Sequence, residues 1–209
     1  MTMFFRLRRK IDYHLSSISW INQLKWNSYR ANNTEIKIII GASSTKFKGW
    51  FPTEKSFLNI SNPLHFKRLF HKLPIDAILA EHVLEHLTNK DLELMVKNFY
   101  NYSSARVTIR VAVPDGYHTN PAYIGEVKPG GTGEGAFDHK NLFTYKSLSA
   151  LFEKGGFKAH PVEYWDENGT FHRGYVNDDK GYVLRSFIND PRNRKGKPNY
   201  TSLIVDFRK

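Results

Sequence analysis

Three short apolar runs, rich in β-branched residues, constrain the fold of this chain more than any other feature. They are IKIIIG at residues 36–41, IDAILA at 75–80 and ARVTIRVAVP at 105–114. Runs of this length, with so little polar interruption, are typical of strands buried on both faces of a parallel sheet. Helical patterns at residues 63–73 and 82–102 separate the runs. This order predicts a three-layer α/β sheet.

The rest of the chain supplies further helices and closing strands. Residues 5–29 carry apolar side chains at spacings of three and four, so an amphipathic helix is expected there. The helical pattern after the second run should break at Thr88, which can cap its second piece. A long glycine-rich loop is expected at 115–141 and a helix at 144–157. Closing strands, antiparallel where the turns are short, are expected at 158–165, 170–176 and 201–207.

The net charge of +11 is concentrated at the two ends of the chain. Residues 1–30 carry six Lys and Arg side chains against one Asp, and residues 185–209 carry seven against two Asp. Basic ends of this kind can attract a phosphate-bearing partner or an anionic surface. Residues 1–32 are therefore predicted to form a basic amphipathic helical extension, and residues 33–209 a single folded domain.

Other bulk properties exclude several classes of protein. The sequence has no cysteine, so disulfides and thiolate metal sites are excluded. No apolar run approaches the roughly 20 residues that a bilayer-spanning helix needs. The N-terminal MTMFFRLRRK lacks the pattern of a signal peptide. These features predict a cytoplasmic protein without a transmembrane segment.

Polar residues follow each of the three buried runs. They occupy positions 41–44, 81–86 and 115–118. The carboxyl ends of parallel strands meet at one edge of an open α/β sheet, and ligands bind beyond that edge. These three segments are therefore expected to line a common site.

Five segments of the chain resemble short-form class I S-adenosylmethionine-dependent methyltransferases. The family's glycine loop corresponds to IIIGASSTKFKGW, its fourth strand to DAILAEHVLEHL and its fifth to RVAVPDGY. The helix before the last strands corresponds to FDHKNLFTYKSLSALFEKGGF, and the final strand to TSLIVDF. The resemblance implies a Rossmann-like methyltransferase fold for residues 33–209. It also implies S-adenosylmethionine as cofactor and methyl transfer to an oxygen or nitrogen of a small or saccharide-like acceptor.

The resemblance implies cofactor-binding roles for residues at the strand ends. A tight turn of small residues after the first strand lets backbone N–H groups approach the carboxylate and ribose of the cofactor. An acidic side chain near the second strand would accept hydrogen bonds from the ribose hydroxyls. The implied residues are Gly41, Ala42 and Ser43 in the turn, Glu54 as the acid, and Ala80, Glu81 and His82 at the exit of the fourth strand.

The methyl acceptor is expected beside a second group of residues. Methyl transfer needs the acceptor atom in line with the sulfonium, and a base where the acceptor has a proton to lose. We place His118 near the acceptor together with three candidate catalytic residues, His86, Asp115 and His139. No metal ion is assigned to the site in this interpretation.

A non-catalytic relative of the family is one alternative. Only eight residues separate Gly41 from Trp50, which is too few for the long helix that normally follows the first strand of the family. A chain with so thin a glycine loop could serve as a binding or scaffold protein. Failure to bind the cofactor with an intact fold would support this alternative.

A zinc hydrolase is the other alternative. His82, Glu85 and His86 form a His-x-x-Glu-His motif, in which both histidines would lie on one helical face and Glu85 would act as base. A distant Glu such as Glu163 would be the third ligand. A purely structural role, with His86 shaping the start of the helix, is also compatible with the methyltransferase fold.

Overall fold

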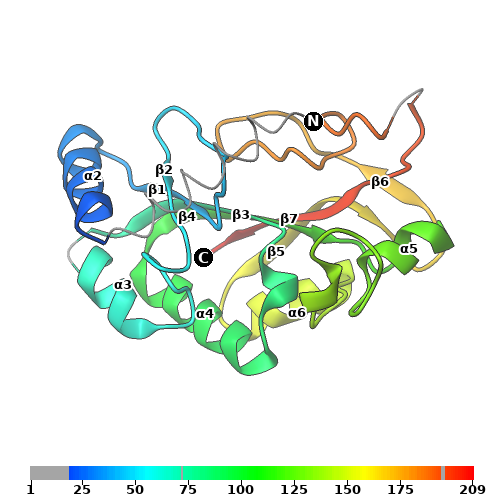
Figure 1. The fold of residues 1–209 in the computed structure, drawn as a ribbon, viewed down its shortest axis with the longest axis horizontal. Helices are drawn as coiled ribbons and strands as arrows, with labels where there is room; N and C mark the ends of the chain where they lie inside the picture. Colours follow the sequence, from blue (N-terminus) through cyan, green and yellow to red (C-terminus); the bar gives the residue numbers. More distant parts are fainter. Residues whose placement is uncertain (1–18, 72, 194–195) are drawn as a thin grey trace.

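A mixed sheet of seven strands forms the centre of the computed structural model, which describes residues 19–71, 73–193 and 196–209 (Figure 1). Across the sheet the strands are β2 (Phe51–Pro52), β1 (Lys37–Ile40), β3 (Ile75–Glu81), β4 (Ser103–Pro114), β7 (Ser202–Arg208), β5 (Lys158–Trp165) and β6 (Phe171–Arg173). β1 pairs in parallel with β2 and β3, and β3 with β4. β7 is antiparallel to both β4 and β5, and β6 is antiparallel to β5. The mostly parallel α/β sheet with antiparallel C-terminal strands is therefore confirmed.

Three helices cover one face of the sheet, α3 (Pro63–Phe70), α4 (Asn89–Tyr102) and α6 (Tyr145–Lys154) (Figure 1). Each begins at a capping side chain that accepts a hydrogen bond from a backbone N–H of its first turn. The cap of α4 is Thr88, as predicted, and a 3-10 turn, η1 (Leu84–His86), precedes it. The helices bury a large aromatic and aliphatic core against β1, β3, β4 and β7.

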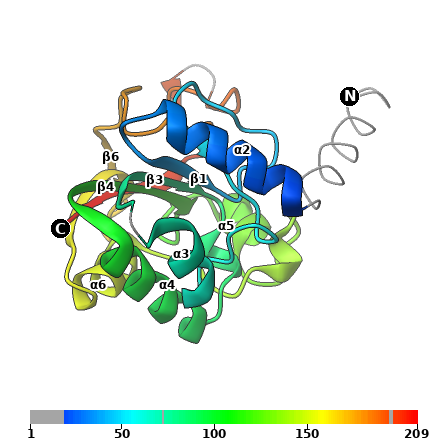
Figure 2. The same ribbon diagram turned by 90° about the vertical axis from the view of Figure 1, so that its left-hand side faces the viewer.

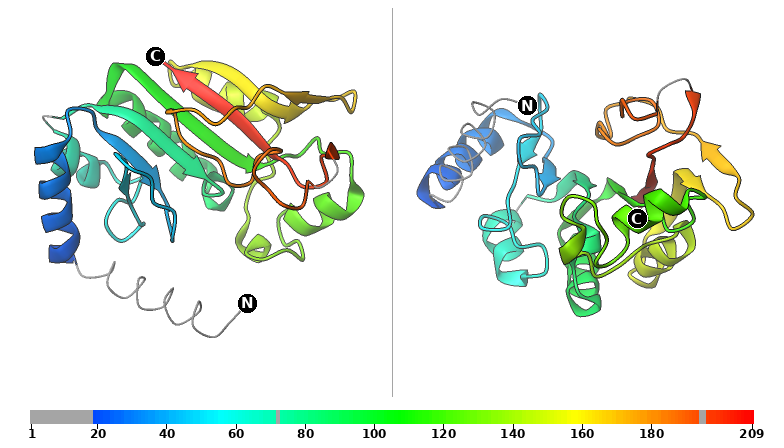
Figure 3. Two further views of the ribbon diagram at one scale, coloured as in Figure 1. Left: turned by 90° about the horizontal axis from the view of Figure 1, so that it is seen from above. Right: turned by 45° about the vertical axis from the view of Figure 1, so that its right-hand side comes forward.

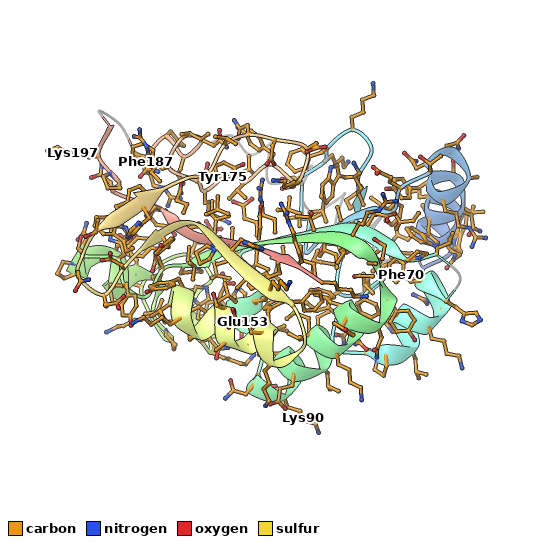
Figure 4. All side chains as sticks on the ribbon, turned by 180° about the vertical axis from the view of Figure 1, so that it is seen from behind. Phe70, Lys90, Glu153, Tyr175, Phe187 and Lys197 are labelled. Carbon is orange, nitrogen blue, oxygen red and sulfur yellow. The ribbon has the colours of Figure 1, made fainter. Side chains whose placement is uncertain are left out.

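The opposite face is covered by chain without helix or strand, residues 174–193, which we call the covering segment. Tyr175 and Val183 of this segment pack on Ile39, Leu79 and Ile204 of the sheet. Figure 3 shows the segment lying over the strands, and Figure 4 shows Tyr175 and Phe187 on the side opposite to Lys90 of α4 and Glu153 of α6. A sheet face must be covered, and the short connection between β1 and β2 provides no helix to do so. The third layer is therefore made by the covering segment.

A buried ion-pair network holds the covering segment on the sheet. Arg110 of β4 is 1% exposed and donates from Nε and Nη2 to the carboxylate of Asp206, at 2.7 and 2.9 Å. Its Nη1 donates to Asp178 Oδ1 at 2.6 Å and to the Gly181 carbonyl at 2.8 Å. The guanidinium thus joins two strands to the segment above them.

Helix α2 (Ser19–Asn32) lies along the β1–β2 edge of the sheet (Figure 2). Trp26 is 1% exposed, and its ring lies 5.1 Å from that of Phe51 and 5.3 Å from that of Phe70. The predicted apolar face is wrong at Leu24, which is 59% exposed. The first part of the predicted helix, residues 5–18, lies outside the described residues. No helix in the described part of the chain is long and apolar enough to cross a membrane.

The predicted loop at 115–141 contains more regular structure than expected. Asn120 caps a helix, α5 (Pro121–Val127), by accepting from the Ala122 N–H. A 3-10 turn, η2 (Ala136–Asp138), follows the glycine-rich stretch. The proline at the first helical position and the Asn before it are the local signals for α5.

Candidate functional site

A cavity of about 670 Å³ opens where β1 and β3 end, and we call it the strand-end cavity. Its walls come from residues 39–45, at the end of β1 and in the turn after it, and from the end of β3 with η1. Parts of residues 126–139, parts of residues 184–192 in the covering segment, and Tyr200 complete them. Two of the three predicted strand exits therefore meet here. The third, at 115–118, contributes no lining residue.

The turn after β1 contributes Gly41, Ala42 and Ser43 to the cavity wall, as the sequence predicts. Gly41 has φ +59°, and a Cβ there would come 2.8 Å from Val83 Cγ2, so this position requires glycine. The amide of Ala42 donates to the Thr53 carbonyl, and that of Ser43 donates to Glu54 Oε1 at 2.5 Å. Glu54 therefore braces the turn and does not line the cavity.

The exit of β3 presents alternate residues to the cavity, because successive strand side chains point to opposite faces. Leu79, Glu81 and His82 line the cavity. Ala80, predicted to contact the cofactor, is fully buried in the core under the helices and does not line the cavity. The carboxylate of Glu81 accepts from the amides of Leu184 and Arg185, at 3.1 and 2.7 Å, and burial raises its pKa. Glu81 thus ties the covering segment to the site.

His82 is not helical, which contradicts the hydrolase motif as predicted. It has φ +53°, and η1 begins two residues later, so His82 and His86 do not share a helical face. Its Nε2 lies 2.9 Å from Ser202 Oγ, and burial lowers its pKa well below the ordinary value. Glu163, the proposed third ligand, does not line the cavity.

Glu85, His86 and His139 form a cluster in the cavity wall. One possible ligand atom from each lies within 4.8 Å of the other two. Glu85 is 0% exposed, and neither of its carboxylate oxygens has a hydrogen-bond partner among the described residues. Its Oε1 lies 3.4 Å from His82 Nδ1 and 3.9 Å from His139 Nε2. Burial raises the pKa of Glu85 to about 8, so the carboxyl group is largely neutral at pH 7 when nothing charged faces it.

Hydrogen bonds bring His139 to this cluster from a distant part of the sequence. The amides of Lys140 and Asn141 donate to the Glu85 carbonyl, at 2.7 and 3.1 Å. The side chains of the same two residues donate to the carbonyls of His86 and Leu87, at 2.6 and 2.7 Å. The loop is therefore fastened to η1, and the predicted neighbours His86 and His139 do lie together, with ring centroids 4.7 Å apart.

Asp115 and His118, predicted beside the acceptor, lie outside the cavity. Asp115 is 0% exposed, and its two oxygens accept from the amides of Tyr117 and Trp165, at 3.0 and 2.7 Å. Burial raises its pKa to about 6. His118 stacks on Tyr123, with centroids 4.0 Å apart. The strand-exit rule gives the edge of the sheet, but at this exit the Asp115 side chain turns into the protein and bonds to the end of β5, across the intervening β7.

Two residues of the cavity wall, Arg185 and Arg192, were not assigned to the site from the sequence. Both lie in the basic C-terminal part, where charge alone suggested an external partner. Arg192 pairs with Asp190 and lies over the Tyr200 ring. The Arg185 guanidinium pairs with no carboxylate among the described residues, although its backbone amide bonds Glu81.

The buried carboxyl group of Glu163 predicts a pH-dependent stability. Glu163 Oε1 accepts from the Phe187 amide, Oε2 has no partner in the described structure, and burial raises the pKa from 4.5 to about 7. The folded state therefore binds this proton more tightly than the unfolded state. The stabilising contribution is present below pH 4.5 and is lost as the pH rises through 7.

Glu163→Gln keeps the shape and the bond to Phe187 but cannot ionise. We expect the variant to unfold at the same urea concentration as the parent near pH 4.5. At pH 8 it should be more stable by about 3 kcal/mol. Urea unfolding at both pH values measures this. Equal pH dependence in the two proteins would contradict the prediction.

Comparison with known proteins finds likenesses among solved structures. No family model matches the sequence, and no curated protein matches it. A SAM-dependent methyltransferase from Archaeoglobus fulgidus has 14% identity and a TM-score of 0.49, over 90% of this chain and 94% of that one. One from Mesorhizobium loti has 10% identity and a TM-score of 0.48, over 88% and 97%. LepI in complex with SAH has 11% identity and a TM-score of 0.43, over 89% of this chain and 39% of LepI. We therefore argue function from the residues of the site.

Proposed function

We propose that the protein is an S-adenosylmethionine-dependent methyltransferase whose cofactor occupies the strand-end cavity. The observation that carries this proposal is the position of the cavity. It opens at the carboxyl ends of β1 and β3, beside a turn in which Gly41 and Ser43 both have positive φ. Open α/β sheets bind their nucleotide-containing ligands at such an edge.

The size and lining of the cavity fit this cofactor. A volume of about 670 Å³ lies in the usual range for small-molecule sites, about 300–1,000 Å³. Ile39, Leu79 and Leu184 offer apolar walls to the adenine ring. The Arg185 guanidinium, which pairs with no carboxylate among the described residues, suits the cofactor carboxylate, and Ser43 or Ser44 can reach other polar groups of the cofactor. When bound, the cofactor would supply the activated methyl group.

The acceptor would lie between the cofactor and the histidines of the cavity wall. His86 and His139 face each other there, and a neutral imidazole can take the proton that an oxygen or nitrogen acceptor loses. The covering segment and the loop carrying His139 would limit the entry of water. A small or saccharide-like acceptor remains our proposal, since the wall near these histidines is polar.

A non-catalytic binding protein is the second candidate, and one observation favours it. The amides of Ala42, Ser43 and Thr45 are already bonded to Thr53, Glu54 and Ala42, respectively. A cofactor carboxylate therefore finds few free amide donors in this turn, and its binding depends on Arg185. A test of cofactor binding separates the two candidates.

Isothermal titration of the purified protein with S-adenosylmethionine and S-adenosylhomocysteine is the deciding experiment. We expect one-to-one binding with a Kd of about 1 μM to 1 mM, the usual range for enzyme substrates. Arg185→Ala should weaken binding about tenfold or more, since a hydrogen bond to a charged group contributes about 1.5–3 kcal/mol. Arg173→Ala removes the same charge from an exposed position outside the cavity and should bind like the parent.

The opposite result is equally clear. A folded protein that shows neither heat nor thermal stabilisation at about 5 mM ligand, well above the usual range, would contradict the methyltransferase proposal. The same result would support the second candidate, a non-catalytic binding protein. Equal weakening by Arg185→Ala and Arg173→Ala would place the cofactor outside the strand-end cavity.

A further inference from the structure

The cluster of Glu85, His86 and His139 has the composition and geometry of a metal site. We propose that it binds a divalent transition-metal ion such as Zn²⁺. Two imidazoles and one carboxylate are ligands that Zn²⁺ accepts, and their candidate ligand atoms lie within 4.8 Å of one another. The His-x-x-Glu-His motif of the sequence contains Glu85 and His86, but its third residue is His82 and not His139.

The buried carboxylate of Glu85 is the strongest evidence. Buried polar atoms in folded proteins nearly always have hydrogen-bond partners, because an unpaired one is costly. Both oxygens of Glu85 lack one among the described residues, although the side chain is 0% exposed. A cation between Glu85 and the two imidazoles would satisfy this group.

The contacts of the two histidines favour tautomers that leave Nε2 free to bind a metal. His139 Nδ1 lies 2.7 Å from the Val127 carbonyl, so this nitrogen carries the proton and Nε2 keeps its lone pair. That Nε2 lies 3.9 Å from Glu85 Oε1. His86 Nδ1 lies 3.5 Å from Asp138 Oδ2, which favours the same tautomer. Metal-bound histidines typically donate their other N–H to a carbonyl or a carboxylate in this way.

The surrounding backbone and charges support the site. Hydrogen bonds from Lys140 and Asn141 fix the loop of His139 against η1, so the three side chains are positioned before a metal binds. The carboxylates of Glu85 and Asp138 would balance the charge of a divalent ion. The Lys140 ammonium donates to the His86 carbonyl and lies 3.7 Å from Asp138 Oδ1, and this carboxylate offsets part of the repulsion between Lys140 and a metal ion.

Three protein ligands leave at least one position on the ion open. The cluster lines the strand-end cavity, so this position would face the bound acceptor or water. An acceptor hydroxyl bound to the ion would have a lower pKa and would release its proton to solvent water, so the two ligated imidazoles would not serve as the base. This role rests on the proposed methyltransferase function, whereas metal binding itself does not.

Titration of the chelator-treated, tag-free protein with ZnCl₂, and with CoCl₂ followed by visible absorption, tests the site. We expect one equivalent of Zn²⁺ to bind with a Kd at or below about 1 μM. Since loss of an outer partner costs about 10- to 100-fold, Glu85→Gln and His86→Ala should weaken binding about 100-fold or more, and Asp138→Asn about tenfold. His172→Ala, which breaks a surface His–Asp pair outside the cavity, should bind like the parent.

Circular dichroism confirms that each variant is folded, and Glu85→Gln keeps the side-chain shape. Absence of one-to-one binding at about 100 μM Zn²⁺, far above the expected Kd, would overturn the proposal. Binding that Glu85→Gln and His86→Ala leave unchanged would overturn it as well. Repeating the S-adenosylmethionine titration in chelator separates this proposal from the methyltransferase, because each ligand is then tested without the other.

Discussion

Arg110→Met is expected to lower the free energy of unfolding by about 3–5 kcal/mol, because it removes one partner of a buried ion-pair network. Methionine fills much of the same volume, but it leaves the carboxylate of Asp206, which is 4% exposed, without its two guanidinium hydrogen bonds. Asp178 and the Gly181 carbonyl lose the guanidinium donor at the same time, and among the described residues Asp178 keeps only its contacts with Lys180.

Arg110→Met should also disturb the wall of the strand-end cavity. Residues 178–183 are held over the sheet by Arg110, and the cavity wall at Leu184 and Arg185 follows directly. We therefore expect weaker binding of any cavity ligand in addition to lower stability. Urea unfolding and ligand titration measure the two effects separately.

Arg106→Met is the matched control, since Arg106 lies on the same strand and is exposed. Its unfolding free energy should change by no more than about 0.5 kcal/mol. If Arg110→Met were as stable as Arg106→Met, the network would not be what holds the covering segment.

The strands and helices could be predicted from the sequence because their signals are local. The runs 36–41, 75–80 and 105–114 each became a strand of the parallel part of the sheet. Thr88 could be predicted as the cap of α4, because a hydroxyl residue followed by helical spacing is a signal contained within a few residues.

The covering segment could not be predicted, because what orders it lies far away in the sequence. Residues 177–193 show no helical or strand period, and one of their anchors is a side chain on β4. One signal was present: Arg110 is the charged residue in the middle of an apolar run. A charge at such a position needs a buried partner, which here comes from Asp178 and Asp206.

The placement of the candidate residues could be predicted where the topology decides it, and could not be predicted where side-chain direction decides it. The strand-exit rule brought together Gly41, Glu81 and His86. It cannot tell which side of a strand a residue faces, and Ala80 and Asp115 accordingly turned into the core. His139 was predicted beside His86 from the resemblance, yet the hydrogen bonds that bring it there involve backbone carbonyls, which leave no trace in the sequence.

Trp26→Ala is expected to destabilise the protein by about 3–5 kcal/mol, as is usual when a buried aromatic ring is removed from a core. The indole packs on Phe51 of β2 and Phe70 of α3, and is 1% exposed. Trp20→Ala on the same helix is the control, because Trp20 is 65% exposed and should change stability by no more than about 0.5 kcal/mol.

This pair of variants also tests where the folded domain begins. The sequence predicted an extension at 1–32 and a domain at 33–209, but Trp26 completes the core, and the Tyr29 hydroxyl accepts from the Lys37 amide at 2.9 Å. We propose that the second half of α2 folds with the domain. Thermal unfolding should then show one transition in the parent, shifted to lower temperature in Trp26→Ala only. Equal transitions in the two variants would mean that α2 is a separable extension.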